Sequence, residues 1–154
     1  MVKKYRQNLI QFSYPDNWEL QPPDRSELPQ EISVESPDGC LWIVTIFSAN
    51  HDPKKLFNEA LKTLGENYQD FEYESIKPES EPKPEKAVMA NFFCLDFLIT
   101  AKIQVFVRRP FVYLVMQQAE NRLYDRSHAV FEAITTSLLG SRPSEPTHDT
   151  VSDS

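Results

Sequence analysis

Apolar and polar residues alternate in four segments of the chain, and this period of two is typical of strands that bury one face. The four segments are residues 9–15, 18–20, 31–36 and 70–76. In the last segment the acidic residues share one face, opposite Phe71 and Tyr73. We interpret this acidic row as a solvated face that discourages pairing at a sheet edge, in preference to a site for a metal or a basic partner.

Longer apolar segments predict the remaining strands of the sheet. They comprise residues 40–47, 87–95, 99–108 and 111–118, and the last three form a meander. The first and last are apolar on both faces, so we expect them at the centre with layers above and below. In the segment 99–108, Lys102 and Gln104 are expected to point outward. Asp38-Gly39 predicts a hairpin turn, because glycine accepts a positive φ.

Two segments have the 3.6-residue period of amphipathic helices. The first begins with Asp52 as N-cap and Pro53 at the first helical position, and Gly65 is expected to end it. The second spans residues 121–139 and is expected to end at Gly140. Both apolar stripes are interpreted as core packing. They consist of Leu56, Phe57, Ala60, Leu61 and Leu64 in the first helix, and of Leu123, Tyr124, Val130, Phe131, Ile134 and Leu138 in the second.

This order of elements predicts an α+β fold with an antiparallel sheet. Because two strands are apolar on both faces, we expect one helix on each face, which makes an α-β-α sandwich. The alternative packs both helices on one face and leaves the other for a ligand or partner. Residues 1–140 are predicted to form a single domain. Residues 141–154 contain one apolar residue and are predicted to be a disordered acidic tail.

Composition excludes several classes of function. The 154 residues include three scattered glycines, so the glycine motifs that bind dinucleotides or phosphates are absent. A net charge of −7 argues against nucleic-acid binding. No apolar segment is long enough to span a membrane as a helix. The charged N-terminus is not followed by the apolar region of a secretory signal, so we expect a cytoplasmic protein.

Reactive side chains form no recognisable catalytic or metal-binding motif. Cys40 and Cys94 lie in no Cys-x-x-Cys pair, and we expect both to be reduced, buried and structural. His51, His128 and His148 lack the spacings of metal ligands. We therefore assign no catalytic, cofactor-binding or metal-ligating residue and no cofactor, and we leave the partner-binding residues unassigned.

Two stretches of the chain resemble the PsbP-like superfamily. Phe12-Ser13-Tyr14-Pro15-Asp16-Asn17-Trp18 is similar to its opening strand and Pro-x-x-Trp turn, and residues 118–138 to its closing strand and helix, with a Phe-x-x-Ile-x-x-Ser-Leu ending. The superfamily includes the photosystem II protein PsbP, a Ran-binding nuclear-import factor and bacterial DcrB-like proteins. The resemblance covers residues 9–139 and implies an α-β-α sandwich that binds partners without catalysis. No ligand-binding or GTPase-binding residue carries over.

Three functional hypotheses remain. The leading one is a non-enzymatic interaction or scaffolding domain whose partner is another protein. The second is a module that binds a small molecule or lipid in a pocket between the sheet and the C-terminal helix. The third is an enzyme with a dispersed site, which requires a cleft that brings His51 or His128 together with an acid.

Overall fold

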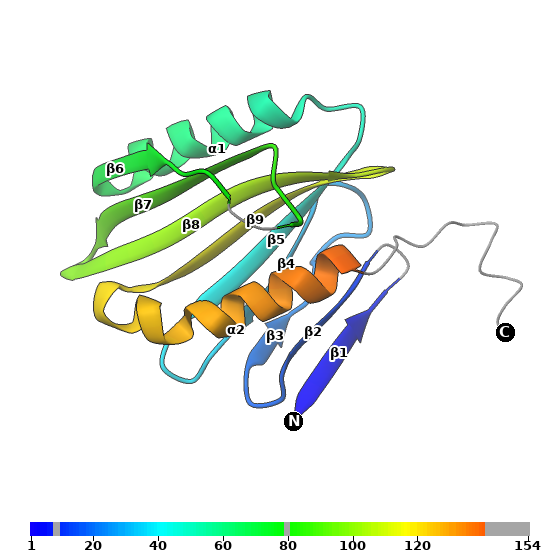
Figure 1. Ribbon diagram of the computed structural model, residues 1–154, viewed down its shortest axis with the longest axis horizontal. Helices are drawn as coiled ribbons and strands as arrows, with labels where there is room; N and C mark the ends of the chain where they lie inside the picture. Colours follow the sequence, from blue (N-terminus) through cyan, green and yellow to red (C-terminus); the bar gives the residue numbers. More distant parts are fainter. Residues whose placement is uncertain (8–9, 79–80, 141–154) are drawn as a thin grey trace, which may run out of the picture.

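A seven-stranded antiparallel sheet is the centre of the computed structural model, which describes residues 1–7, 10–78 and 81–140 (Figure 1). The strand order is β3-β4-β5-β9-β8-β7-β6, and β1 and β2 form a separate two-stranded sheet. The strands are β1 (Val2–Arg6), β2 (Gln11–Pro15), β3 (Glu19–Gln21), β4 (Gln30–Glu35), β5 (Leu41–Ser48), β6 (Gln69–Ser75), β7 (Lys86–Cys94), β8 (Phe97–Arg108) and β9 (Phe111–Glu120), and the helices are α1 (Pro53–Asn67) and α2 (Asn121–Gly140).

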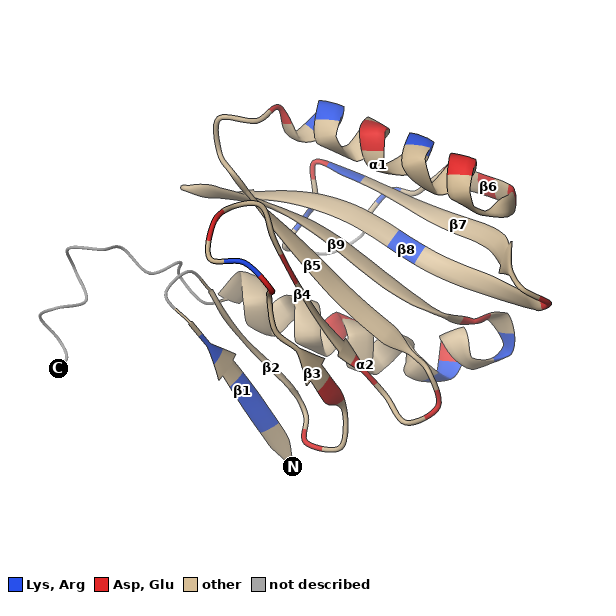
Figure 2. Ribbon diagram, turned by 180° about the vertical axis from the view of Figure 1, so that it is seen from behind, with Lys and Arg blue, Asp and Glu red and all other residues tan. Residues whose placement is uncertain are grey.

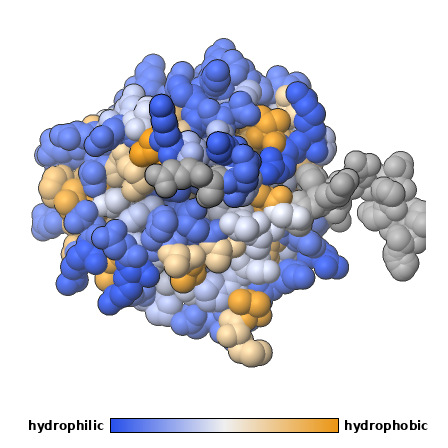
Figure 3. Space-filling model, viewed as in Figure 1, coloured by the Kyte–Doolittle hydropathy of each residue, from blue (hydrophilic) through white to orange (hydrophobic). Residues whose placement is uncertain are grey.

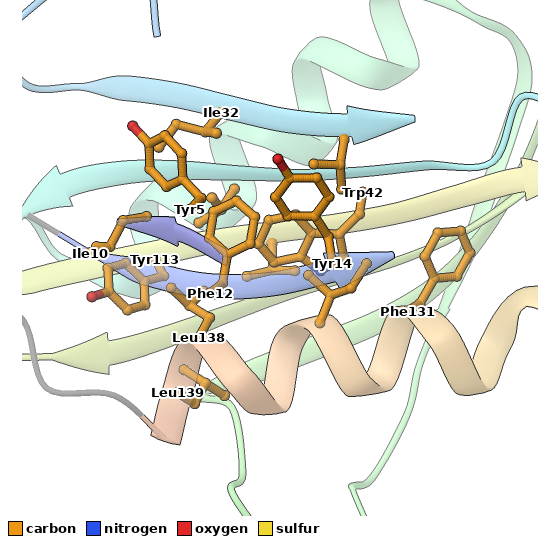
Figure 4. Close-up of a cluster of buried hydrophobic side chains, with 14 of the residues drawn as sticks. Tyr5, Ile10, Phe12, Tyr14, Ile32, Trp42, Tyr113, Phe131, Leu138 and Leu139 are labelled. Carbon is orange, nitrogen blue, oxygen red and sulfur yellow. The ribbon is translucent and has the colours of Figure 1, made fainter. Parts of the chain in front are cut away.

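One face of the sheet is covered by α2 together with the β1–β2 hairpin (Figure 1). Aromatic side chains of β2 and the sheet meet apolar side chains of α2 there, as Figure 4 shows. The Phe12 and Trp42 ring centroids are 4.9 Å apart, and Trp18 meets Phe131 edge to face at 6.0 Å. Trp42 and Phe131 are completely buried. This cluster is the larger of the two cores.

Helix α1 packs on the opposite face, against β6, β8 and β9. As expected, Asp52 caps its N-terminus and accepts a hydrogen bond from the Lys54 backbone N–H at 3.0 Å, and Pro53 is its first residue. Phe57 and Leu61 are buried in a second, smaller core on this face. The α-β-α sandwich is therefore confirmed, and the alternative with both helices on one face is wrong.

The structure corrects several details of the sequence analysis. Helix α1 runs two residues past Gly65, and its C-cap is Tyr68, whose backbone N–H bonds the carbonyl of Leu64. Gly65 therefore does not end the helix. Strand β1 was not expected, because only Tyr5 of its five residues is buried. The turn at Asp38-Gly39 is confirmed, with φ +90° at the glycine.

Strand positions agree with the predicted roles of the strands. The acidic strand β6 lies at one edge of the sheet, and β5 and β9 pair with each other at its centre. The proposed tail, residues 141–154, lies outside the described residues, so its disorder stays a prediction. Within the described ranges, neither helix is both long and apolar enough to cross a membrane.

Candidate functional site: an apolar groove beside α1

An open groove of about 350 Å³ runs between α1 and the uncovered part of the sheet. Its floor is formed by side chains of β5, β8 and β9, one wall by α1, and the far rim by a residue of β4. The lining residues are Glu31, Ile43, Thr45, Phe47, Leu56, Glu59, Ala60, Thr63, Leu64, Ile103, Leu114 and Met116. The groove is predominantly apolar and open to solvent.

The groove exists because α1 covers only part of its face of the sheet. Along β5, Trp42, Val44 and Ile46 point toward α2 and are buried, whereas Ile43 and Thr45 on the α1 side stay half-exposed. Strand β9 repeats this asymmetry, with half-exposed residues on the α1 face. Helix α1 lies over the half of the sheet that contains β6 and β8, so the half that contains β4 and β5 has no helix above it.

The apolar stripe of α1 has two functions in the structure. Phe57 and Leu61 fill the core, but Leu56, Ala60 and Leu64 are half-buried and line the groove. The prediction of core packing holds for Phe57 and Leu61, and Leu56 and Leu64 pack against the edge of the same core while their outer sides line the groove. The physical reason is the placement of the helix, since a stripe more than one side chain wide exposes its outer side when the helix is not centred on the sheet.

Acidic residues alone supply charge to the groove. Glu31 lies on the rim strand and Glu59 on the helix, and both side chains are exposed. No lysine or arginine is among the residues that line the groove in the described part of the chain. Figure 2 shows β5 without charged residues and β9 with one only at its α2 end, so the floor between the two carboxylates is uncharged. This arrangement complements an apolar segment with basic ends.

The α2 face instead holds a buried polar network. The Trp42 indole donates to Thr135 Oγ1 at 2.9 Å, and Thr135 donates to Gln117 Oε1 at 3.3 Å. Gln117 Nε2 donates to Glu132 Oε2 at 2.7 Å, and Lys102 Nζ lies 3.1 Å from the same oxygen. The network joins β5, β8 and β9 to α2, and its members satisfy one another. It therefore fixes the helix on the sheet.

A small polar pocket of about 100 Å³ lies beside this network. It is lined by α2, β8 and Pro78, Glu81, Pro82 and Pro84, and Gln104 is buried in its wall, where its Oε1 has no hydrogen-bond partner among the described residues. The expectation that Gln104 points into solvent is wrong, because α2 covers this face of β8. The pocket has room for about three water molecules, whose O–H groups are the donors that this oxygen requires.

Of the three histidines, the structure describes His51 and His128, and it places both at the surface. His51 is exposed, and its Nδ1 lies 3.2 Å from the Ser48 carbonyl oxygen at the start of the loop before α1. His128 is also exposed, with Nε2 3.6 Å from Glu132 Oε2 one helical turn away. Neither histidine lines the groove or the polar pocket. His148 lies outside the described residues. Among the described residues, no cluster of three potential ligands could hold a metal ion.

The two cysteines lie in different environments and are not bonded to each other. Cys40 is buried at the start of β5, and its sulfur contacts Ser127 Oγ at 2.9 Å. Cys94 is exposed at the end of β7. The expectation that both are buried is therefore wrong for Cys94, because the end of its strand extends beyond the two helices.

Sequence reasoning missed the groove, although one signal was present. Ile43, Leu114 and Met116 belong to strands that are apolar on both faces, which predicts a layer on each side. Two such strands and a single 15-residue helix leave more apolar sheet surface than the helix can cover. Comparing the surface that α1 can cover with the apolar surface of both strands would have indicated that part of the sheet stays uncovered.

Three solved structures share this architecture at low sequence identity. Cyanobacterial PsbP (CyanoP) from Synechocystis sp. PCC 6803 aligns with a TM-score of 0.61 at 11% identity, over 88% of this chain and 90% of that chain. The Ran-binding protein Mog1p of Saccharomyces cerevisiae gives 0.58 at 9% identity, over 91% and 93%. LpqN of Mycobacterium tuberculosis, involved in cell envelope biogenesis, gives 0.51 at 15% identity, over 94% and 91%.

Sequence comparison adds no closer relation. No protein-family model and no curated protein matches the chain. At identities of 9–15% the structural neighbours establish the architecture alone. The predicted resemblance is thereby confirmed at the level of the fold, and the chain has a PsbP-like α+β fold.

Proposed function

We propose that this chain is a non-enzymatic protein-interaction domain, and that the α1 groove binds an apolar segment of a partner protein with basic residues on either side. The observation that carries the proposal is the partly buried apolar floor of the groove, formed by Ile43, Leu114 and Met116 at the centre of the sheet, which no helix covers completely. Apolar surface at the centre of a sheet is normally covered, and contiguous exposed apolar surface commonly marks an interaction site.

The charges beside the groove favour one kind of flanking residue in a partner segment. Glu31 and Glu59 flank the groove without a compensating cation among its lining residues. Lysine or arginine residues beside an apolar segment would meet these carboxylates, whereas acidic residues would be repelled. The groove therefore favours apolar segments with basic flanks over those with acidic flanks.

The neighbours in structure support an interaction role without specifying a partner. Mog1p is described as Ran-binding, and CyanoP carries the name of a PsbP protein. The reactive groups in the described part of the chain also fit a binding role, because His51, His128 and Cys94 do not line the groove. Cytoplasmic location stays a prediction from the N-terminal sequence.

A small apolar ligand is the second candidate. The groove volume of about 350 Å³ falls at the lower end of the range for ligand sites, which is about 300–1,000 Å³. Such sites enclose most of the ligand, however, and this groove is open along one side. The apolar groove also lies beside α1 rather than beside the C-terminal helix, where the sequence analysis placed a ligand pocket. An extended or helical segment of a protein suits an open groove better than a small molecule does.

Two fluorescent peptides with the same apolar centre, one flanked by lysines and one by glutamates, test the proposal. Ala60→Phe fills the groove from the α1 wall, and Asn58→Phe places the same side chain on an exposed position of α1 outside it. Fluorescence anisotropy should show binding of the lysine-flanked peptide. Ala60→Phe should weaken binding at least tenfold, and Asn58→Phe should leave it within twofold.

Equal binding of both peptides, or equal effects of both substitutions, contradicts the proposal. A thermal-shift series with decanoate and dodecanol separates the second candidate. A rise in Tm with these ligands that Ala60→Phe abolishes, together with no peptide binding, would favour the ligand-binding function.

A further inference from the structure

The hairpin between β7 and β8 exposes large apolar side chains at one end of the molecule. Phe93 is 38% exposed, Leu95 86% and Phe97 53%. We call these three residues the apolar tip. In Figure 3 the visible surface is mostly hydrophilic with separate apolar patches, one of them at the left end, where β7 and β8 meet. Solvent-exposed apolar residues at a hairpin end are normally replaced by polar turn residues.

The backbone conformation at the turn of this hairpin is a second feature that is unfavourable for stability. Cys94 pairs with Phe97, which leaves Leu95 and Asp96 as the connecting residues, and Leu95 has φ +57°. Left-handed backbone at a turn is normally supplied by glycine or asparagine, because the Cβ atom of an L residue comes too close to the following carbonyl oxygen in this conformation. A bulky apolar residue thus occupies a position where both its conformation and its exposure are unfavourable.

The tip is apolar on both faces of the hairpin. Phe97 lies on the α1 face, in register with Cys94, and Phe93 lies on the α2 face, in register with Leu98. Leu95 lies at the turn that joins the two strands. A flat partner would contact one face and leave the other in water, whereas a concave pocket encloses both. The geometry therefore indicates insertion of the tip into a pocket.

The charged residues around this end are acidic except for Arg122 at the start of α2. Arg122 lies close to the start of β8, because Glu120 is in register with Ile99, and its guanidinium is paired with Glu120 at 3.2 Å. Residues 66–76 contain Glu66, Asp70, Glu72 and Glu74, and residues 87–101 contain Asp96, with no lysine or arginine in either segment. Strand β6 pairs with β7 in a register that places Gln69 opposite Phe93 and Glu72 opposite Asn91. Carboxylates of β6 and of the turn residue Asp96 therefore lie next to the apolar tip.

We propose that the apolar tip docks into an apolar pocket on a partner protein, and that lysine or arginine residues form the rim of that pocket. An anionic membrane is disfavoured because it would repel the acidic residues around the tip. The groove of a second copy of this chain is disfavoured for the same reason, since Glu31 and Glu59 flank it. The tip lies outside the α1 groove, so this docking site is independent of the proposed groove function.

Site-specific photo-crosslinking tests this proposal in extracts of cells that make the protein. p-Benzoylphenylalanine replaces Leu95 in the full chain, and a control chain carries it at Lys62, an exposed position on α1. Unlabelled wild type, the Leu95→Ser/Phe97→Ser variant and the Ala60→Phe variant serve as competitors in tenfold excess. Thermal unfolding of each variant verifies its fold, and mass spectrometry maps the crosslinked peptide on the partner.

The expected result is one protein adduct that is specific to position 95. Wild type and Ala60→Phe should suppress this adduct at least fivefold, and the folded tip variant should not. The mapped site should combine apolar residues with lysine or arginine, and the yield should fall between 50 and 500 mM salt. Adduct formation with a second copy of the chain overturns the proposal, as does equal suppression by the tip variant. Absence of a position-specific adduct, or cosedimentation with vesicles of phosphatidylcholine and phosphatidylglycerol that the tip variant loses, also overturns it.

Discussion

The indole N–H of Trp42 donates a hydrogen bond to Thr135 Oγ1 at 2.9 Å, across the interface between β5 and α2. Both side chains are buried, and Thr135 in turn donates to Gln117 Oε1 on β9. One hydroxyl thus satisfies a donor and an acceptor from two neighbouring strands. This relationship explains how a helix with polar residues on its buried face remains fixed on an apolar sheet.

Thr135→Val should destabilise the protein by about 1–3 kcal/mol, because it leaves the buried Trp42 donor and the Gln117 acceptor without this partner. Urea unfolding followed by tryptophan fluorescence measures the change. Thr136→Val is the matched control, since Thr136 is exposed on the same helix. Its effect should stay within about 0.5 kcal/mol. Equal effects of the two substitutions would show that the hydroxyl of Thr135 is not important for stability.

Gln104→Met should leave stability unchanged or raise it by up to about 1 kcal/mol. The substitution keeps the shape of the side chain and removes the buried Oε1 atom, which has no hydrogen-bond partner in the part of the chain that the structure describes. Gln117→Met is the contrasting variant, because Gln117 is buried and hydrogen-bonded to Glu132 and Thr135. That variant should lose about 1–3 kcal/mol. A large loss for Gln104→Met would indicate an ordered hydrogen-bonding partner for this side chain in solution.

Burial raises the pKa of Tyr124 from 10.0 to about 12, with smaller contributions from Glu132 and Asp125 that raise it and from Gln117 that lowers it. The folded state therefore holds the phenol proton more tightly than the unfolded state does. The resulting stability is complete below pH 10 and is lost as the pH rises from 10 to about 12.

Tyr124→Phe should reduce the fall in unfolding free energy across this range by about 2 kcal/mol, relative to wild type. Urea unfolding at pH 9, 10 and 11.5 measures the difference. Burial also raises the pKa of Tyr113, so a residual decline is expected in the variant. Parallel pH profiles of wild type and variant would show that Tyr124 does not titrate as the structure implies.

Thiol reactivity should separate the two cysteines. Cys94 is exposed and should react rapidly with an aromatic disulfide reagent under native conditions, whereas Cys40 is buried and should react only as the protein unfolds. A stopped-flow trace should therefore show one fast and one slow phase of equal amplitude. Cys94→Ser should abolish the fast phase alone. Two fast phases would show that the segment around Cys40, just before β5, opens readily.

Periodicity was sufficient to predict every strand except β1, both helices and the preferred layer order, because each depends on the spacing of apolar residues along one element. The edge position of β6 also followed from its acidic face. The prediction that α1 ends at Gly65 was wrong, because the helix continues to Asn67. A glycine marks a helix end only where the backbone turns out of the helical conformation.

The groove and the buried Gln104 could not be derived in the same way. Both depend on where the helices lie across the sheet, and that placement is set by packing between distant segments. Lys102 and Gln104 alternate with apolar residues as in a solvated strand, yet α2 covers them. The exposure of Leu95 could not be predicted from the sequence either, because an apolar residue at a strand end gives the same pattern whether or not another element covers it.

Leu95→Asn should raise the unfolding free energy by up to about 1 kcal/mol, because asparagine tolerates the left-handed backbone that Leu95 adopts at φ +57°. The side chain of Leu95 is 86% exposed, so its removal sacrifices little buried surface. Urea unfolding measures the change, with Leu98→Asn as a destabilising contrast in the half-buried part of the same hairpin. A decrease for Leu95→Asn comparable to that for Leu98→Asn would mean that Leu95 packs against the fold. An increase would show that the wild-type residue is unfavourable for stability, as expected for a side chain that serves contact with another molecule.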